Sequence, residues 1–478
     1  MSTMKNLTMS TDLYQINMMY AYYKKGMDSQ RTVFDVFFRK APCGSGYAIF
    51  AGLEQVLEYI ESIRFTEEDI AYLRSIYPYE EAFLDKLRTF RFTGNIAAMK
   101  EGTVVFPGEP LIRVEAAICE AQLIETTMLT IINHQTLIAT KAARIVGAAK
   151  GDTILEFGLR RAQGAEAGYY GARAAYIGGV HATSNMMAGR DFNIPVKGTH
   201  AHSFVQIFEH EFDAFTAYSE AFPDETVLLV DTYDTLRVGV PHAIRLGLEM
   251  KKRGKRLLGI RLDSGDLAYL SKEARKMLDE AGLQDVAIVA SSDLDEKLIQ
   301  DLKNQEAQIS IWGVGTNLIT SYDCPALGGV YKLAAVERDG VWEPRLKISE
   351  NPIKITNPGY KKVIRFYDRD TNQPLGDLIA LKEETIPEDK MTLFHPLFPH
   401  KRKVIRNYRM ELLLQPVIEQ GVCCYETPSL ASIRSYVKEQ LEHLSPEIKR
   451  LVNPHEYHVD LSQELWDLKQ RLIHQERE

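Results

Sequence analysis

The 478-residue sequence predicts an α/β fold in which an irregular α/β barrel accompanies a mixed α+β domain. Short apolar runs alternate with helical patterns through the middle of the chain, as expected for buried parallel strands. The two flanking regions instead mix helices with short strands and tight turns. The composition, with 45% hydrophobic and 26% charged residues, is that of a globular protein of two or three domains.

The region 1–135 is expected to be the N-terminal part of the mixed domain, completed by the C-terminal segment 341–478. After about residue 340 the pattern is antiparallel, with a hairpin turning near 368–373 and a charged helical tail over 427–478. The elements expected in the first region are helices at 12–25 (capped by Thr11 or Asp12), 52–63 and 121–149, a strand at 32–38, and short strands within 94–114.

The middle region, 136–340, is expected to be the barrel. An open doubly wound sheet is the alternative. In either architecture ligands bind at the carboxyl ends of the strands, so the residues just after each apolar run are the candidate site. The runs are TILEF (153–157), VLLV (227–230), LLGIRL (257–262), VAIVA (286–290) and ISIW (309–312), with further segments at 177–205 and 329–335.

Charge and cysteine usage exclude several classes of function. The net charge of −8 does not favour nucleic acid, which usually requires a basic surface. None of the five cysteines forms a C-x-x-C pair, so we expect reduced thiols in a cytoplasmic protein, without a disulfide framework. The N-terminal stretch lacks the pattern of a signal peptide, and no run of about 18 apolar residues predicts a membrane span.

EFGLRRAQG (156–164) places Arg160 and Arg161 just after a strand. Guanidinium groups bind carboxylates and phosphates through two parallel hydrogen bonds, which suits an anionic substrate. One of the two could instead pair with a structural acid such as Glu166. Phe157 is either a core residue or a surface for a flat ring.

GIRLDSGDLA (259–268) gathers polar groups in one turn. A carboxylate there can accept hydrogen bonds from ribose hydroxyls or hold Mg²⁺. Asp266 suits a helix N-cap, whereas Asp263 beside Arg261 has the character of a functional pair. Ser264 and Gly265 complete the candidate turn.

The residues that follow two later apolar runs are also candidates for the site. SSDLDE (291–296) is interpreted either as a helix cap at Ser292 or Asp293 or as part of the site. In WGVGTNL (312–318), the backbone amides at Gly313 and Gly315 could bind a phosphate, with the Thr316 hydroxyl as a further donor.

KGTHAHSF (197–204) contains His200 and His202, which would face the same way on a strand. Such a pair binds a metal in barrel hydrolases, but the residues that follow the later apolar runs here are Asp, Ser and Gly, with no further histidine. The residues leave two other interpretations open. The histidines could be buried and satisfied, or one could be a nucleophile that accepts a phosphoryl group, with a carboxylate fixing its tautomer.

These motifs, together with TDLYQINMMYAYY (11–23), FFRKAP (37–42) and HPLFPHKRK (395–403), resemble those of the nicotinate phosphoribosyltransferase family, a group of type II phosphoribosyltransferases. The resemblance implies transfer of nicotinate to phosphoribosyl pyrophosphate, giving nicotinate mononucleotide and pyrophosphate, with Mg²⁺ and coupled ATP hydrolysis. It implies that His202 is the phosphorylated residue and that His200 occupies a variable position. No metal ligands are assigned by it.

The resemblance also implies how the pyridine ring is held. Phe157 and Tyr14 would stack on it, and in the related nicotinamide enzyme the equivalent tyrosine comes from the neighbouring subunit, which implies a homodimer with shared active sites. Thr183, Ser184 and Asn185 stand where that enzyme has an acid, and neutral donors suit a carboxylate. Nicotinamide remains an alternative substrate, as do a metal-dependent barrel hydrolase and a binding protein without activity.

Overall fold

The computed structural model describes residues 6–395, 397–398 and 400–475, which divide into two compact units. One unit combines the chain up to Leu137 with the chain from Ala326 onward, and the other is Ile138–Pro325. N- and C-terminal segments therefore share one unit. Pro396 and Pro399 of the 395–403 motif, the first five residues and the last three lie outside this description.

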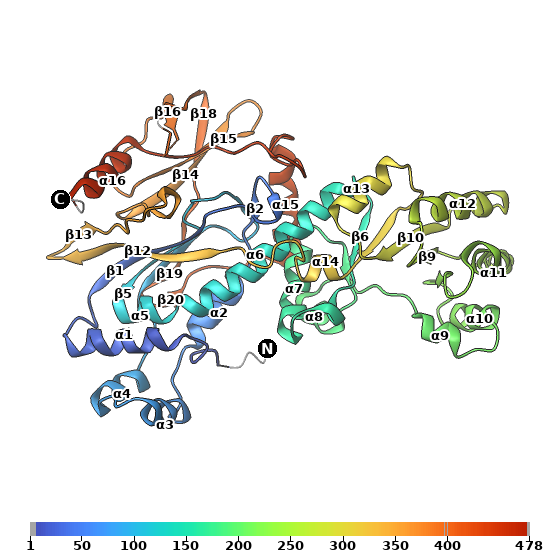
Figure 1. Cartoon of the computed structure of the whole chain (residues 1–478), viewed down its shortest axis with the longest axis horizontal. Coiled ribbons are helices and arrows are strands. Elements are labelled where there is room, and N and C mark those ends of the chain that lie inside the picture. The colour runs from blue at the N-terminus through green and yellow to red at the C-terminus, as the bar shows by residue number, and fades with distance from the viewer. Residues whose placement is uncertain (1–5, 396, 399, 476–478) are drawn as a thin grey trace. The chain divides into compact units, whose positions relative to one another are not determined.

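The second unit is built on a parallel sheet with the strand order β7-β6-β11-β10-β9-β8. Figure 1 labels β6, β9 and β10 of this sheet. The first long strand of this unit, β6, pairs with its last strand, β11. Pairing of the first strand with the last is the cyclic order of a barrel, and an open doubly wound sheet does not have it. The barrel is irregular because β7 and β8, the two ends of this order, do not pair with each other. Thr183 of β7 instead forms an isolated parallel bridge with Val196. Its strands are β6 (Thr153–Glu156), β7 (Ala182–Thr183), β8 (Val227–Leu229), β9 (Gly259–Leu262), β10 (Ala287–Ser292) and β11 (Ile311–Val314).

Helices follow these strands, and side-chain caps fix where several of them begin. Asp266 accepts the N–H of Tyr269 at 3.0 Å and caps the next helix, as predicted. The cap in the 291–296 stretch is Asp295, whose carboxylate accepts the N–H of Leu298 at 2.7 Å, and not Ser292 or Asp293. The helices include α7 (Ala165–Ile177), α8 (Met186–Phe192), α9 (His202–Gln206), α10 (Glu211–Ala221), α11 (Val240–Lys252), α12 (Leu267–Glu280), α13 (Glu296–Asn304) and α14 (Thr316–Ile319).

The segment 329–335 does not join the barrel. It lies in β12, which pairs antiparallel with β1 in the first unit. The second unit therefore ends at Pro325, ahead of the residue 340 boundary expected from the sequence. The apolar run marks a buried strand correctly, but its sequence does not specify the partner strand.

The first unit contains an antiparallel sheet in the order β13-β12-β1-β5-β3-β19-β20. Its apolar side chains join those of the helices in one continuous core. The strands are β1 (Arg31–Phe38), β3 (Asn95–Ala98), β5 (Ile112–Ala117), β12 (Gly329–Arg338), β13 (Val341–Pro344), β19 (Gln415–Glu419) and β20 (Val422–Cys423), and the helices at the core include α1 (Leu13–Lys24), α2 (Leu53–Ser62), α5 (Ile118–Leu123) and α6 (Glu125–Ala148).

A second sheet of this unit has the order β18-β14-β15-β21. The predicted hairpin is present, because Asp368 donates its N–H to the carbonyl of Gln373 at 2.9 Å across the turn. The elements are β14 (Lys361–Asp368), β15 (Pro374–Leu381), β18 (Tyr408–Leu412) and β21 (Val459–Leu461), with η4 (Pro352–Lys354), α15 (Leu430–His443) and α16 (Gln463–Gln475) nearby in sequence.

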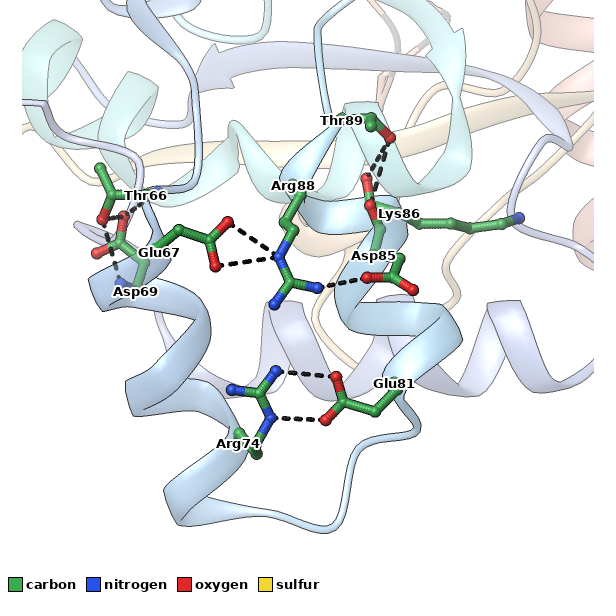
Figure 2. A network of polar contacts seen from close by, with 9 residues as sticks. All are labelled: Thr66, Glu67, Asp69, Arg74, Glu81, Asp85, Lys86, Arg88 and Thr89. Carbon is green, nitrogen blue, oxygen red and sulfur yellow. Dashed lines mark hydrogen bonds and ion pairs between the residues drawn. The ribbon is translucent and has the colours of Figure 1, made fainter.

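Two short helices, α3 (Glu67–Ile76) and α4 (Glu81–Arg88), are joined by exposed ion pairs. Figure 2 shows Arg74 facing Glu81, with hydrogen bonds of 2.6 and 2.8 Å. Arg88 reaches Glu67 at 3.0 and 3.2 Å in the same view. Exposed pairs of this kind contribute roughly 0–1 kcal/mol each, so they orient the two helices more than they stabilise the fold.

Candidate active site

The carboxyl ends of β8, β9 and β10 bring together a set of polar side chains centred on Arg261. Its guanidinium Nε donates to the Ser291 hydroxyl at 2.7 Å, and Nη2 donates to Asp263 at 2.7 Å. Its Nη1 donates to the Thr199 hydroxyl at 2.9 Å, and this hydrogen bond connects the carboxyl end of β9 to the 197–204 segment. Arg261 is therefore held in one pose by three partners, and a side chain fixed in this way can bind an anion without further ordering.

Asp263 is an ionised carboxylate in this setting. Burial by itself would raise the pKa of its carboxyl group, but a hydrogen bond from Ser291 and the charge of Arg261 outweigh it and lower the pKa below its ordinary value. Its Oδ1 accepts from Arg261 and Ser291. Its Oδ2 faces the imidazole of His202, 3.8 Å from Nε2. The site thus presents a negative oxygen next to the candidate phosphoryl acceptor.

Asp231 is a second carboxylate beside His202. Its Oδ2 accepts the backbone N–H of Asp263 at 2.9 Å and the Ser264 hydroxyl at 2.8 Å. Its side chain is only 1% exposed, and Oδ1, 4.0 Å from His202 Nε2, has no hydrogen-bond partner within the described residues. A buried carboxylate oxygen without a partner is costly, so this oxygen is a candidate acceptor for a ligand.

His202 does not lie on a strand. It is the first residue of α9, its Nδ1 lies 3.1 Å from the Thr232 hydroxyl, and its side chain is 39% exposed. The ring is held at Nδ1 by Thr232, while Nε2 has no hydrogen-bond partner among the described residues and faces the two carboxylates. This is the arrangement that a nucleophilic imidazole requires.

His200 points to different surroundings from His202, so the expectation that the two face the same way is wrong. The chain turns from extended backbone into α9 at Ala201, and the alternation of a strand does not apply. His200 is buried, its Nε2 accepts the backbone N–H of Leu229 at 3.2 Å, and its ring packs near Phe204 and Tyr218. Burial lowers the pKa of His200 to about 4, so the ring is neutral at physiological pH.

Phe157 follows β6 and lies at the rim beneath Arg261, whose guanidinium carbon is 5.9 Å from the ring centre. The ring is close to Gly313, where a Cβ atom would lie 2.7 and 2.8 Å from two of its carbons. Gly313 therefore makes room for the Phe157 ring, because any side chain at this position would meet it. Gly315 next to it is the N-cap of α14, and Thr316 is the first residue of that four-residue helix.

A buried acid, Glu156, organises the segment that follows β7. Its Oε2 accepts the Thr183 hydroxyl at 2.6 Å and its Oε1 accepts the N–H of Gly158. Asn185 caps α8 through Ala188 and donates to the carbonyl of Gly168. Thr183 and Asn185 are therefore engaged within the protein, and Ser184 is the residue of this trio whose hydroxyl remains available for a ligand.

Arg160 and Arg161 lie in the turn η2 (Leu159–Arg161) and are exposed. Neither forms an ion pair with Glu166 or with another acid in the described part of the chain. Ser292 has a φ of 135°, a strained value for a residue other than glycine, at the end of β10. Ser292 and Asp293 are both exposed at this rim, and Gly265 has a φ of 82° in the turn after Asp263.

Tyr14 belongs to the first unit, where it lies on α1 and is 47% exposed. The polar residues of the site that were not among the predicted site residues include Glu156, Thr199, Asp231, Thr232 and Ser291. Asp231 follows the VLLV run directly, so its position after a strand was the available signal. Ser291 and Glu156 lie within strands and are recognisable only from their partners.

Within the described ranges, no three His, Cys, Asp or Glu side chains are grouped as a metal site would require. The described helices include none that is long and apolar enough to cross a membrane.

The fold and this rim define an α/β-barrel enzyme that acts on anionic small molecules. Family models for the N-terminal domain, the family region and the C-terminal domain of nicotinate phosphoribosyltransferase match residues 9–133, 153–363 and 360–469. The chain belongs to the nicotinate phosphoribosyltransferase family.

Individual relatives agree with this assignment. The chain is 51% identical to the nicotinate phosphoribosyltransferase of Bacillus subtilis over 98% of this chain and 96% of that protein. It is 34% identical to the human enzyme over 95% of this chain and 94% of that protein. The crystal structure of human nicotinic acid phosphoribosyltransferase matches with a TM-score of 0.86 at 32% identity, covering 97% of this chain and 99% of that one.

Proposed function

We propose that the protein is a nicotinate phosphoribosyltransferase. It would convert nicotinate and phosphoribosyl pyrophosphate into nicotinate mononucleotide and pyrophosphate, coupled to ATP hydrolysis through a phosphohistidine, as the first step of NAD salvage from nicotinate. The observation that carries the proposal is the placement of His202 within 4.0 Å of two carboxylates at the rim of the barrel. The names of the relatives supply the substrate.

The phosphoryl relay assigns one role to each neighbour of His202. The neutral imidazole attacks the γ-phosphorus of ATP, the bond to the β-phosphate oxygen breaks, and ADP leaves. Water later cleaves the nitrogen–phosphorus bond and releases phosphate. Thr232 holds Nδ1, which leaves Nε2 as the attacking nitrogen, next to the carboxylates of Asp231 and Asp263.

Mg²⁺ is the cofactor that this rim fits. Hard divalent cations prefer carboxylate oxygens, and Oδ1 of Asp231 and Oδ2 of Asp263 are the oxygens left available there. When bound, Mg²⁺ would neutralise charge between phosphate oxygens and these carboxylates. The role of Asp263 in the transfer itself is to stabilise the positive charge that develops at the ribose carbon as pyrophosphate departs.

The nicotinate pocket would be built around Phe157. Its ring provides one stacking face, and Tyr14 from a second subunit would provide the other in a cytoplasmic homodimer. Arg160, Arg161 and Arg261 supply positive charge for the substrate carboxylate and the 5′-phosphate. Ser184 is the neutral donor assigned to the carboxylate, and the turn formed by Ser264 and Gly265 is assigned to the ribose, together with Ser292 and Asp293. Gly315 and Thr316 are assigned to the phosphate.

The metal-hydrolase alternative loses its basis because His200 and His202 do not converge. The substrate is tested by product analysis with Mg²⁺, phosphoribosyl pyrophosphate and either nicotinate or nicotinamide, with and without ATP. We expect nicotinate mononucleotide as the preferred product and a higher yield with ATP. Product from nicotinamide alone would instead assign the related activity, and absence of product from both substrates would contradict the proposal.

A further inference from the structure

Helix α16 carries a buried lysine that has no carboxylate partner among the described residues. Lys469 is 6% exposed, and its Nζ donates one hydrogen bond, to the Asn357 side chain at 2.8 Å. An ammonium group has three N–H donors, so two of them have no acceptor among the described residues. A buried charge in this condition destabilises a protein unless something else compensates it.

The surroundings add positive charge instead of balancing it. Lys361, also buried, is itself paired with Asp35, whose carboxylate lies 2.7 Å from its Nζ. Burial, followed by the charge of Lys361, lowers the pKa of Lys469 to about 8. The amine is therefore still mostly protonated at neutral pH.

A second unpaired donor lies one helical turn away. The indole Nε1 of Trp466 is buried and has no acceptor within the described residues. Trp466 and Lys469 are three residues apart, so they share one face of α16. Both line a cavity of about 230 Å³ whose wall also includes Pro352, Ile355, Gln470 and Ile473.

We propose that this cavity is a binding site for a small monocarboxylate with an apolar body. Its two oxygens would accept hydrogen bonds from the ammonium of Lys469 and the indole of Trp466, which satisfies the unpaired donors. Its hydrocarbon part would pack on Pro352, Ile355 and Ile473. A phosphate carries about two charges and no apolar body, so it fits one lysine and an apolar wall less well.

The test uses the full-length protein and hexanoate, with 1-hexanol as a neutral ligand of similar shape. Binding is measured by isothermal titration calorimetry on the wild type, on Lys469→Met and on Trp466→Phe. Lys438→Met serves as control, because Lys438 is an exposed lysine on α15 paired only with Glu442. Thermal unfolding of each variant checks that the fold is intact.

We expect hexanoate to bind the wild type and Lys438→Met equally and 1-hexanol to bind at least roughly tenfold more weakly. Lys469→Met should lose at least roughly tenfold in affinity, and Trp466→Phe a smaller part. Equal binding of hexanoate to Lys469→Met, equal binding of the alcohol, or no hexanoate binding to the wild type would overturn the proposal. Nicotinate transfer should be unchanged in Lys469→Met, so this result is independent of the proposed function.

Discussion

The Nε2 atom of His200 accepts the backbone N–H of Leu229 at 3.2 Å. Leu229 lies in β8, which does not pair with β7, the strand at the other end of the barrel sheet. Leu229 is the last residue of β8, and Asp231 follows two residues later. His202 lies two residues after His200. The imidazole of His200 thereby joins the two segments whose next functional residues, Asp231 and His202, face each other.

Replacing His200 with Phe should uncouple ATP hydrolysis from transfer. The ring volume is kept, but the N–H of Leu229 loses its acceptor, which costs roughly 1–3 kcal/mol for a buried group. We expect the stimulation by ATP to fall at least roughly tenfold, with ATP-independent transfer changed much less. Steady-state rates with and without ATP measure this, and His200→Gln, which keeps an acceptor, should recover part of the coupling. Equal loss of both rates would assign His200 a purely structural role.

The same histidine predicts how stability depends on pH. The pKa of His200 is about 4 in the folded protein against an ordinary 6.5, so the unfolded chain binds its proton first as the pH falls. The stabilisation is complete above about pH 6.5 and is lost as the pH falls toward 4, by on the order of 3 kcal/mol. Urea unfolding from pH 7 to 4 should show a steeper loss in the wild type than in His200→Phe. Parallel pH profiles would contradict this assignment.

Gly313→Ala should affect the binding of nicotinate. The added Cβ would lie 2.7 and 2.8 Å from the Phe157 ring, so the ring must move. We expect KM for nicotinate to rise several-fold, while KM for phosphoribosyl pyrophosphate changes less. Gly147→Ala on α6 is the matched control, because a Cβ there meets open space. An unchanged KM for nicotinate would remove Phe157 from the ring site.

Tyr14→Ala should weaken nicotinate binding, and mixing tests whether the tyrosine comes from a second subunit. A Tyr14→Ala chain and a His202→Ala chain in one heterodimer would together form one complete site. Co-refolded mixtures should then recover roughly a quarter of wild-type activity at low nicotinate, since half of random dimers carry one intact site of two. No recovery would indicate that Tyr14 acts within its own chain or outside the site.

The strands of the barrel were predictable because buried parallel strands are continuous apolar runs, and all five runs contain or overlap strands. The helix cap at Asp266 was predictable from local sequence alone. The cap at Asp295 was missed because four acidic or hydroxyl residues precede α13 in the 291–295 stretch, and the sequence does not show which of them has the backbone conformation of a cap.

The sequence does not show which side chains contact one another across the fold. Thr183 and Asn185 have the right chemistry for a ligand, but Glu156 and Gly168 engage them. His200 and His202 were expected to face the same way, as on a strand, but α9 begins at His202 and the alternation of a strand ends there. Strand β12 was placed in the barrel because an apolar run does not specify which sheet it joins.

The most direct test of the central claim is to incubate the protein with Mg²⁺ and ATP labelled in its γ-phosphate and to locate any protein-bound phosphate. The relay predicts an acid-labile, base-stable label on the peptide containing His202, its discharge on adding nicotinate and phosphoribosyl pyrophosphate, and its absence in His202→Ala. His443→Ala, which changes a partly buried histidine on α15 of the other unit, should label normally. A label that persists in His202→Ala would contradict the account, as would ATP-stimulated transfer in that variant.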